Sequence, residues 1–357
     1  MLFSYLFTMA TAATSAFAAP HHKFKGAHWK KGTEEAGAIA ASGAAASSNK
    51  LIYGGGNLLS NVIVKPLYWS NSVMFNFDAF YTAAVSGTTT SPTPFMKMLT
   101  QYSVSGYKLG AGSLSKGIVN FSGLTNGSVT VSAVENYIIS LVNSGTLNPS
   151  GANLYVPVHF APGVVVSEDK GLGLGDSCTV WCAFHYSVYT PKGWVYYGII
   201  PDMGPAAPCN WLCGSSPTVF GLTSQVASHE LAEAITDPSW NQNGWLAPGA
   251  EIGDLCSDHA PFCGSDGYQY HVQTEWSNAV GACAPPPNQP ATCRKGMGVG
   301  NWTSNCAHSV CKAGAGLTNG CSQCASAVCN VKPACCTNSW SSSCVGVVNQ
   351  YCGAGTC

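Results

Sequence analysis

The chain has 357 residues, of which 9% are charged and 46% hydrophobic, and its formal net charge is −1. This length is enough for one large domain or two smaller ones, each with its own core. A charge near zero without a basic run excludes an electrostatic nucleic-acid binder, so we expect no nucleic-acid partner. The 18 cysteines indicate an oxidising compartment, because the cytosol would keep them as thiols.

The N-terminal segment favours export. Residues 1–18 are apolar and small, and Ala16, Phe17 and Ala18 have the small-x-small form of a signal-peptidase site. We therefore expect a signal peptide over residues 1–18 and a secreted protein, extracellular or associated with a cell wall, with no membrane span after cleavage. Residues 19–50 are expected to form a low-complexity arm. The sequence does not decide whether this arm is a removable pro-segment.

The hydrophobic pattern of residues 51–283 predicts both strands and helices. Runs rich in Val, Ile and Tyr predict strands at residues 62–69, 154–160, 183–189 and 195–200. Apolar spacing predicts helices at residues 75–85, 94–102 and 131–142. The strongest helix candidate is residues 218–236, which Pro238 stops. We expect an α/β domain in which this helix packs on a mixed sheet.

The C-terminal part differs in composition. Residues 284–292 form a Pro-rich linker, and residues 293–357 hold 11 of the 18 cysteines with almost no large aliphatic cluster. A segment of this size needs disulfides for its stability, so we expect a small disulfide-rich module. A zinc ribbon at Cys321 and Cys324 is the competing interpretation, but export favours disulfides.

The cysteine count restricts the disulfide pattern. The module has 11 cysteines and the first domain has seven, so either a disulfide joins the two parts or two thiols remain free. In the first domain, Cys178 and Cys182, and likewise Cys209 and Cys213, are close enough in sequence to form local pairs. Spacing alone does not assign the connectivity.

Charged residues are distributed unevenly. No Lys or Arg occurs between Lys192 and Arg294, whereas nine of the 16 acids lie in this span. Buried carboxylates need a positive partner, a proton or a metal, which makes a bound divalent cation an economical explanation. For Asp258, Asp266 and Glu275 we instead expect exposure to solvent or pairing with distant lysines.

One motif in this span has the spacing of a metal site. His229 and Glu233 are four residues apart, so they share one face of the predicted helix, and Glu230 is adjacent. This is the layout of the H-E-x-x-H zinc helix with a carboxylate in place of the second histidine. We expect His229 and Glu233 to bind the metal, with Glu251 or Asp254 as a further ligand and Glu230 as general base.

Other interpretations of these residues need no catalysis. An amphipathic helix with a polar face would carry the same pattern without any metal, and a structural ion such as calcium would also suit the carboxylates. His159, in an apolar strand, is expected to be structural. His259 and His271 are loop residues near the acidic segment, and their spacing demands no role.

Four ordered motifs resemble the EXORDIUM / phosphate-induced protein family over residues 51–283. They are D-x-C-x-x-x-C-x-F-H-Y at residues 176–186, C-x-x-x-C at 209–213, H-E-L-A-E at 229–233 leading to Asp237-Pro238, and E-I-G-D-L-C at 251–256. Plant members tend to have Asn where this chain has Asp237, and the loop after residue 256 is shorter here. The C-terminal module resembles cysteine-rich modules of secreted bacterial proteins.

The resemblance implies secretion and association with the cell wall, and it gives Glu251 and Asp254 more weight. It also adds His185, either as a ligand or oxyanion stabiliser, or as a histidine at the edge of the core that bonds to backbone. We expect a secreted zinc-dependent hydrolase, most simply a peptidase with a zincin-like fold, with catalytic Glu230 and His185. It would act on extracellular protein, peptide or cell-wall material. The alternative is a non-catalytic extracellular or wall-associated factor with a structural ion.

Overall fold

The computed structural model describes part of the chain. The described residues are 50–73, 77–149, 151, 153–204, 209, 213–214, 216, 218–239, 241–264, 266–289, 306–318, 321–322, 324–325, 328–329, 332–348 and 357, with the backbone alone of residues 27–29. The predicted signal peptide lies outside them. Within the described residues, no helix combines the length and the apolar character that crossing a bilayer requires.

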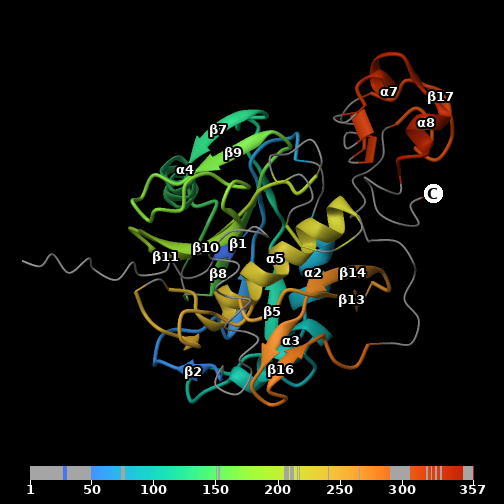
Figure 1. Cartoon of the computed structure of the whole chain (residues 1–357). Helices are drawn as coiled ribbons and strands as arrows, with labels where there is room; N and C mark the ends of the chain where they lie inside the picture. Colours follow the sequence, from blue (N-terminus) through green and yellow to red (C-terminus); the bar gives the residue numbers. More distant parts are fainter. Residues whose placement is uncertain are drawn as a thin grey trace, which may run out of the picture.

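A mixed sheet forms the centre of the first domain (Figure 1). Its strand order is β1 (Ala27–Trp29), β10 (Trp181–Thr190), β11 (Gly193–Ile200), β8 (Leu154–His159), β3 (Asn61–Val64) and β5 (Ala111–Leu114). In addition, β4 (Leu67–Tyr68) pairs with β8, and β6 (Ile118–Val119) pairs with β4. β10 is antiparallel to β1 and β11, whereas β11, β8, β3 and β5 are parallel. The predicted α/β class with a mixed sheet is confirmed.

Hydrophobic residues on both faces explain why the central strands are buried. All six residues of β8 are buried, as expected for a strand that is covered on both sides. Tyr155 packs into one core and Val156 into the other, because successive side chains of a strand point to opposite faces. The same alternation along β10 places Phe184 in the second core, and therefore directs His185 to the opposite face.

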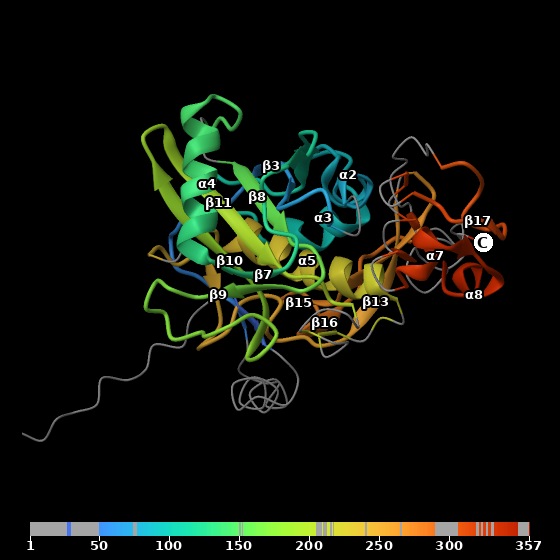
Figure 2. The same ribbon diagram turned by 90° about the horizontal axis from the view of Figure 1, so that it is seen from above.

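Helices cover the two faces (Figure 2). α4 (Val131–Asn143) packs Val134 and Ile138 into one core, and its N-cap Thr130 accepts a hydrogen bond from the amide of Ala133. α2 (Asp78–Val85), α3 (Pro94–Leu99) and α5 (Val219–Thr236) contribute to the other core. The helix predicted at 94–102 ends as a 3₁₀ turn, η1 (Thr100–Tyr102).

The central helix α5 is buried along its whole length. Thr218 caps its N-terminus by accepting a hydrogen bond from Gly221 N at 3.0 Å, and the helix ends at Asp237, before Pro238. All 18 of its residues are buried, including His229, Glu230 and Glu233. Polar groups on such a helix need partners, which other parts of the chain must bring to it.

Short paired strands complete the structure. β14 (Gln269–Gln273) pairs with β13 (His259–Cys263) and contacts α5, and β15 (Glu275–Ser277) pairs with β16 (Ala282–Ala284). The other pairs in the first domain are β7 (Gly127–Thr130) with β9 (Val164–Ser167), and β12 (Trp245–Leu246) with β2 (Ile52–Tyr53). In the C-terminal segment, β17 (Gly314–Ala315) pairs with β18 (Ser339–Trp340), close to α7 (Ala334–Thr337) and α8 (Ser342–Val345).

Disulfides connect distant segments of the first domain. The local pairing of Cys178 with Cys182 and of Cys209 with Cys213 is wrong, because the bonds are Cys178–Cys209 and Cys182–Cys213. Both bonds fasten the start of β10 to the segment before α5, so two distant parts of the chain meet beside the helix. A third bond joins Cys256 to Cys283.

Cys263 is also disulfide-bonded. The other six cysteines of the first domain pair with one another. Four further disulfides staple the C-terminal segment, namely Cys306–Cys321, Cys311–Cys357, Cys329–Cys336 and Cys335–Cys344. The disulfide-rich module is confirmed, and its pairing of Cys321 excludes the zinc ribbon. So many disulfides indicate an oxidising environment such as the extracellular space.

Candidate metal centre

The helix α5 supplies two of the first three polar groups of the centre. His229 and Glu233 are one turn apart, and their Nε2 and Oε1 atoms are separated by 3.1 Å, as the spacing predicted. Asp254 approaches from the loop after β12, with Oδ1 3.9 Å from His229 Nε2. These three residues are close enough to act as ligands of one metal ion.

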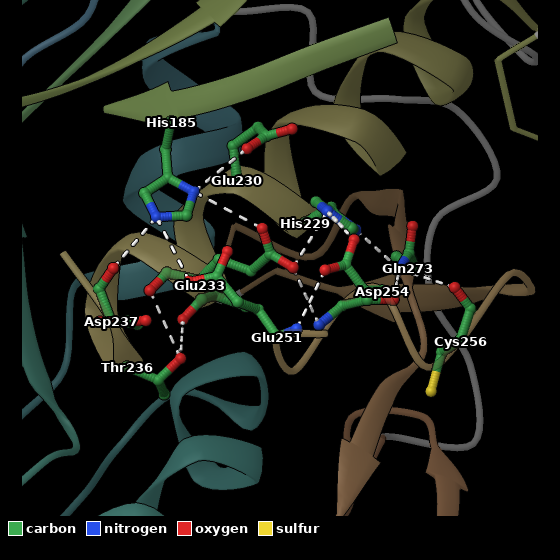
Figure 3. A network of polar contacts seen from close by, with 12 residues as sticks. His185, His229, Glu230, Glu233, Thr236, Asp237, Glu251, Asp254, Cys256 and Gln273 are labelled. Carbon is green, nitrogen blue, oxygen red and sulfur yellow. Dashed lines mark hydrogen bonds and ion pairs between the residues drawn. The ribbon is translucent and has the colours of Figure 1, made fainter. Parts of the chain in front are cut away.

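A second group forms around His185 of β10 (Figure 3). Its Nδ1 lies 3.4 Å from Glu230 Oε2 and 3.5 Å from Glu233 Oε2. Its Nε2 lies 3.1 Å from the backbone oxygen of Asp237 and 3.9 Å from Glu251 Oε1. Both interpretations of His185 are therefore compatible with the structure. Its Nε2 atom contacts the backbone, and its Nδ1 atom faces the acids of α5.

Glu233 is shared by the two groups. One of its carboxylate oxygens faces His229 and the other faces His185. The sets His229–Glu233–Asp254 and His185–Glu230–Glu233 each bring potential ligand atoms within 4.8 Å of one another. All six predicted site residues therefore gather at one place, with Glu251 beside His185.

The loop that carries Glu251 and Asp254 is shaped to fit against α5. The Glu251 amide donates to Asp254 Oδ2 at 2.9 Å, which holds the two acids in a tight turn. Between them, Gly253 passes so close to the helix that a Cβ atom there would lie 2.4 Å from His229 Nδ1. Only glycine permits this approach, so the loop and the histidine ring are mutually fitted.

Gln273 of β14 orients His229. Its Nε2 lies 2.9 Å from His229 Nδ1, and it donates to the backbone oxygens of Gly253 at 2.6 Å and Cys256 at 3.1 Å. These contacts engage the Nδ1 side of the ring and leave Nε2 facing the carboxylates. A metal-binding histidine usually donates its other ring N–H to an acceptor, whereas the Gln273 amide nitrogen donates to Nδ1 of His229.

The centre is deeply buried and rich in negative charge. Glu230 and Glu233 are 0% exposed and Glu251 is 1% exposed. Among the described residues, no group donates a hydrogen bond to either oxygen of Glu230 or to Glu251 Oε2. Burying carboxylates in this way is unfavourable unless they bind a proton or a cation.

The pKa values reflect this balance. Burial raises the pKa of Glu230 and of Asp254 to about 7, and it raises the pKa of Glu251 well above its usual range. Burial acts in the same direction on Glu233, but His229 and His185 outweigh it and lower its pKa. Glu233 is thus the carboxylate that remains charged most readily.

The histidines respond in the opposite sense. Burial would lower the pKa of His229, but Glu233 and the neighbouring acids raise it to about 10. The pKa of His185 is likewise raised, because Glu251, Glu230 and Glu233 outweigh its burial. Without a metal, these two rings would carry positive charge beside Glu233.

Two nearby residues were not anticipated. Gln273 gives no sequence signal, since only the fold brings β14 against α5. Glu275 was expected in solvent, which is wrong: it is 1% exposed, and no described group donates a hydrogen bond to its carboxylate. Burial raises the pKa of Glu275, and the charge of Glu233 adds to that rise. Its position in a span without Lys or Arg was the available signal.

Three other described histidines of the first domain lie in other contacts. His159 stacks on Phe77 and bonds to Tyr81 Oη at 3.0 Å, so its predicted structural role is confirmed. His271 Nδ1 lies 2.5 Å from Ser216 Oγ, and its ring contacts that of His259. Burial lowers the pKa of His271 to about 4, an effect that His259 increases.

Comparison with known proteins gives one match. Residues 304–357, the disulfide-rich end of the chain, are similar to a family described as a domain of unknown function (DUF8252). No curated protein and no solved structure matches the chain. The residues of the candidate centre lie outside the matched segment.

Proposed function

We propose that the protein is a secreted, metal-dependent hydrolase of the peptidase type. The observation that carries this proposal is the gathering of two histidines and three further carboxylates around Glu233 in a buried site. The ion pairs of these carboxylates are with His185 and His229. Two imidazoles do not neutralise four carboxylates, so a divalent cation would complete the charge balance.

The donor set suits zinc better than calcium. We assign His229, Glu233 and Asp254 as ligands, because they contribute one ring nitrogen and two carboxylates from a fixed helix and a tight turn. Glu251 is the further acid at the same place. Calcium prefers six to eight oxygen ligands, whereas zinc binds nitrogen and oxygen with low coordination numbers. Zinc is therefore the proposed ion, with calcium as the alternative.

Glu230 is placed for proton transfer. Glu230 directly follows the proposed ligand His229 in the chain and belongs to the group around His185. It accepts no hydrogen bond from the described residues. When bound, the ion would supply Lewis-acid chemistry, polarising a carbonyl group and lowering the pKa of a water molecule. Glu230 would then take a proton from the attacking water and deliver it to the leaving amine. His185 would hold Glu230 in position through its Nδ1 atom.

A zincin-like arrangement and an extracellular setting follow from the same proposal. The helix that carries the motif packs against the sheet beside β10, and the disulfides fit a secreted protein. Substrates would be extracellular proteins, peptides or cell-wall material.

A structural ion is the second candidate function, and the burial of the carboxylates favours it. Structural metal sites are closed, whereas catalytic ones keep an open position for water or substrate. In that case the protein would be a non-catalytic extracellular or wall-associated factor.

Glu230→Gln separates the two functions. The hydrolase proposal expects this variant to lose peptidase activity by at least about 100-fold while retaining its metal and its melting temperature. Glu135→Gln is the matched control, since Glu135 is a buried carboxylate on α4 that pairs with Lys170 instead. Loss of the metal in Glu230→Gln, or unchanged activity, would contradict the role of Glu230 as base.

A further inference from the structure

The first strand of the sheet comes from the N-terminal arm. β1 pairs antiparallel with β10, matching Ala27 to Phe184, His28 to Ala183 and Trp29 to Trp181. Without β1, β10 would be the edge of the sheet. An edge strand presents unpaired N–H and C=O groups, which form a template for another extended chain.

This edge adjoins the candidate metal centre. The pairing with β1 stops at Phe184, and the next residue of β10 is His185, whose ring faces Glu230 and Glu233. β1 also contacts α5, the helix that carries these acids. A peptide in the same register, continued by one residue toward its N-terminus, would therefore lie opposite His185.

Few contacts hold β1 on the edge of β10. β1 comprises three residues, and its register shifts between His28 and Trp29. Three paired residues make a weak strand that another peptide can replace.

We propose that the β10 edge at residues 181–184 is a binding site for an extended polypeptide, which residues 27–29 occupy in the intact chain. The inference rests on the proposed function in one respect, because it identifies the substrate class as an extended peptide bound by strand addition. Residues 27–29 then act as a self-inhibitory strand at this edge. Its displacement or removal frees the site.

The test uses the full-length protein and a labelled peptide with the sequence of residues 21–35. The double variant Ala27→Pro/His28→Pro removes the amides of two consecutive residues, of which one faces β10 in an antiparallel pair, and so opens the edge. A control chain, Ala27→Val/His28→Ala, changes the same positions but keeps both amides. Fluorescence anisotropy should show at least tenfold tighter peptide binding to the proline variant than to the wild-type and control chains. The same peptide with both prolines should not bind.

Equal affinity of the peptide for all three chains, or equal binding of the proline peptide, would overturn the proposal. Because this measurement requires neither metal nor turnover, it can succeed even if the hydrolase proposal fails. The same experiment on Glu230→Gln should give unchanged peptide binding. If the protein proves to be a peptidase, the opened chain should also cleave peptides faster than the wild-type chain.

Discussion

His185 Nδ1 lies 3.4 Å from Glu230 Oε2, which joins the strand β10 to the central helix α5 inside the protein. The neighbouring residue on the helix, His229, faces Glu233 and Asp254 instead. One helix thus presents its two adjacent polar residues to different partners. In the proposed mechanism, His229, Glu233 and Asp254 hold the ion. Glu230 transfers the proton, and His185 positions Glu230.

Replacing His185 tests this division. We expect His185→Gln to reduce kcat by roughly 100-fold while zinc content is unchanged, because a group that positions the base is lost but no ligand is. The acid limb of the pH–rate profile should shift as Glu230 loses its partner. Ser187→Ala is the matched control, since Ser187 is buried two residues along the same strand. Loss of zinc together with activity would instead identify His185 as a ligand.

Gly253 provides a test of the proposed metal site at His229. A methyl group at this position would lie 2.4 Å from His229 Nδ1, so Gly253→Ala must displace the ring or the loop. We expect the affinity for zinc to fall about 10- to 100-fold, measured by competition with a chelator, because the ligand loses its orientation. The neighbouring change Ile252→Val removes only a buried methyl group and should leave zinc affinity unaltered. Unchanged affinity in Gly253→Ala would exclude His229 as a ligand.

The local part of the centre could be predicted from the sequence. His229 and Glu233 share a helical face because their spacing matches the helix period, and Glu230 is adjacent in the chain. The absence of Lys and Arg from this span also indicated correctly that its acids would lack basic partners nearby. Glu251 and Asp254 were expected as further ligands because they are the acids that follow the helix, but their spacing does not determine how the loop returns to α5.

Contacts between distant segments could not be predicted. Gln273 and Glu275 reach the centre because β14 and β15 pack near α5, and no periodicity reports such packing. The disulfides Cys178–Cys209 and Cys182–Cys213 span 31 residues each, while the closer cysteines of each motif remain unpaired with one another. β1 lies in a polar, lysine-bearing segment that lacks the alternation of apolar and polar residues typical of a strand. It forms only because it pairs with β10 at the end of the sheet.

His159 should make stability depend on pH. Burial lowers its pKa from 6.5 to about 3, so the folded protein keeps the ring neutral. Below pH 6.5 the unfolded chain binds a proton that the folded chain does not, and folding stability falls as the pH decreases toward 3. Between pH 6.5 and 4.5 the loss is about 2 kcal/mol, because the slope approaches roughly 1.4 kcal/mol for each pH unit only below pH 6.5.

The contribution of His159 can be isolated by a double difference. Urea unfolding of the wild type and of His159→Phe, with disulfides intact, would be compared at pH 7.5 and pH 4.5. The phenylalanine variant keeps the stacking on Phe77 but has no titrating ring. The wild type should lose more stability than the variant between these two pH values. An equal loss in both proteins would show that His159 titrates normally in the folded state.

The metal content of the purified protein tests the central claim most directly. Elemental analysis of the wild type should give about one zinc ion per chain, and Glu233→Gln, which alters the shared carboxylate, should lose it. Glu135→Gln should retain the wild-type content. Absence of any divalent ion from the wild type, or full retention of zinc in Glu233→Gln, would contradict a metal centre at Glu233.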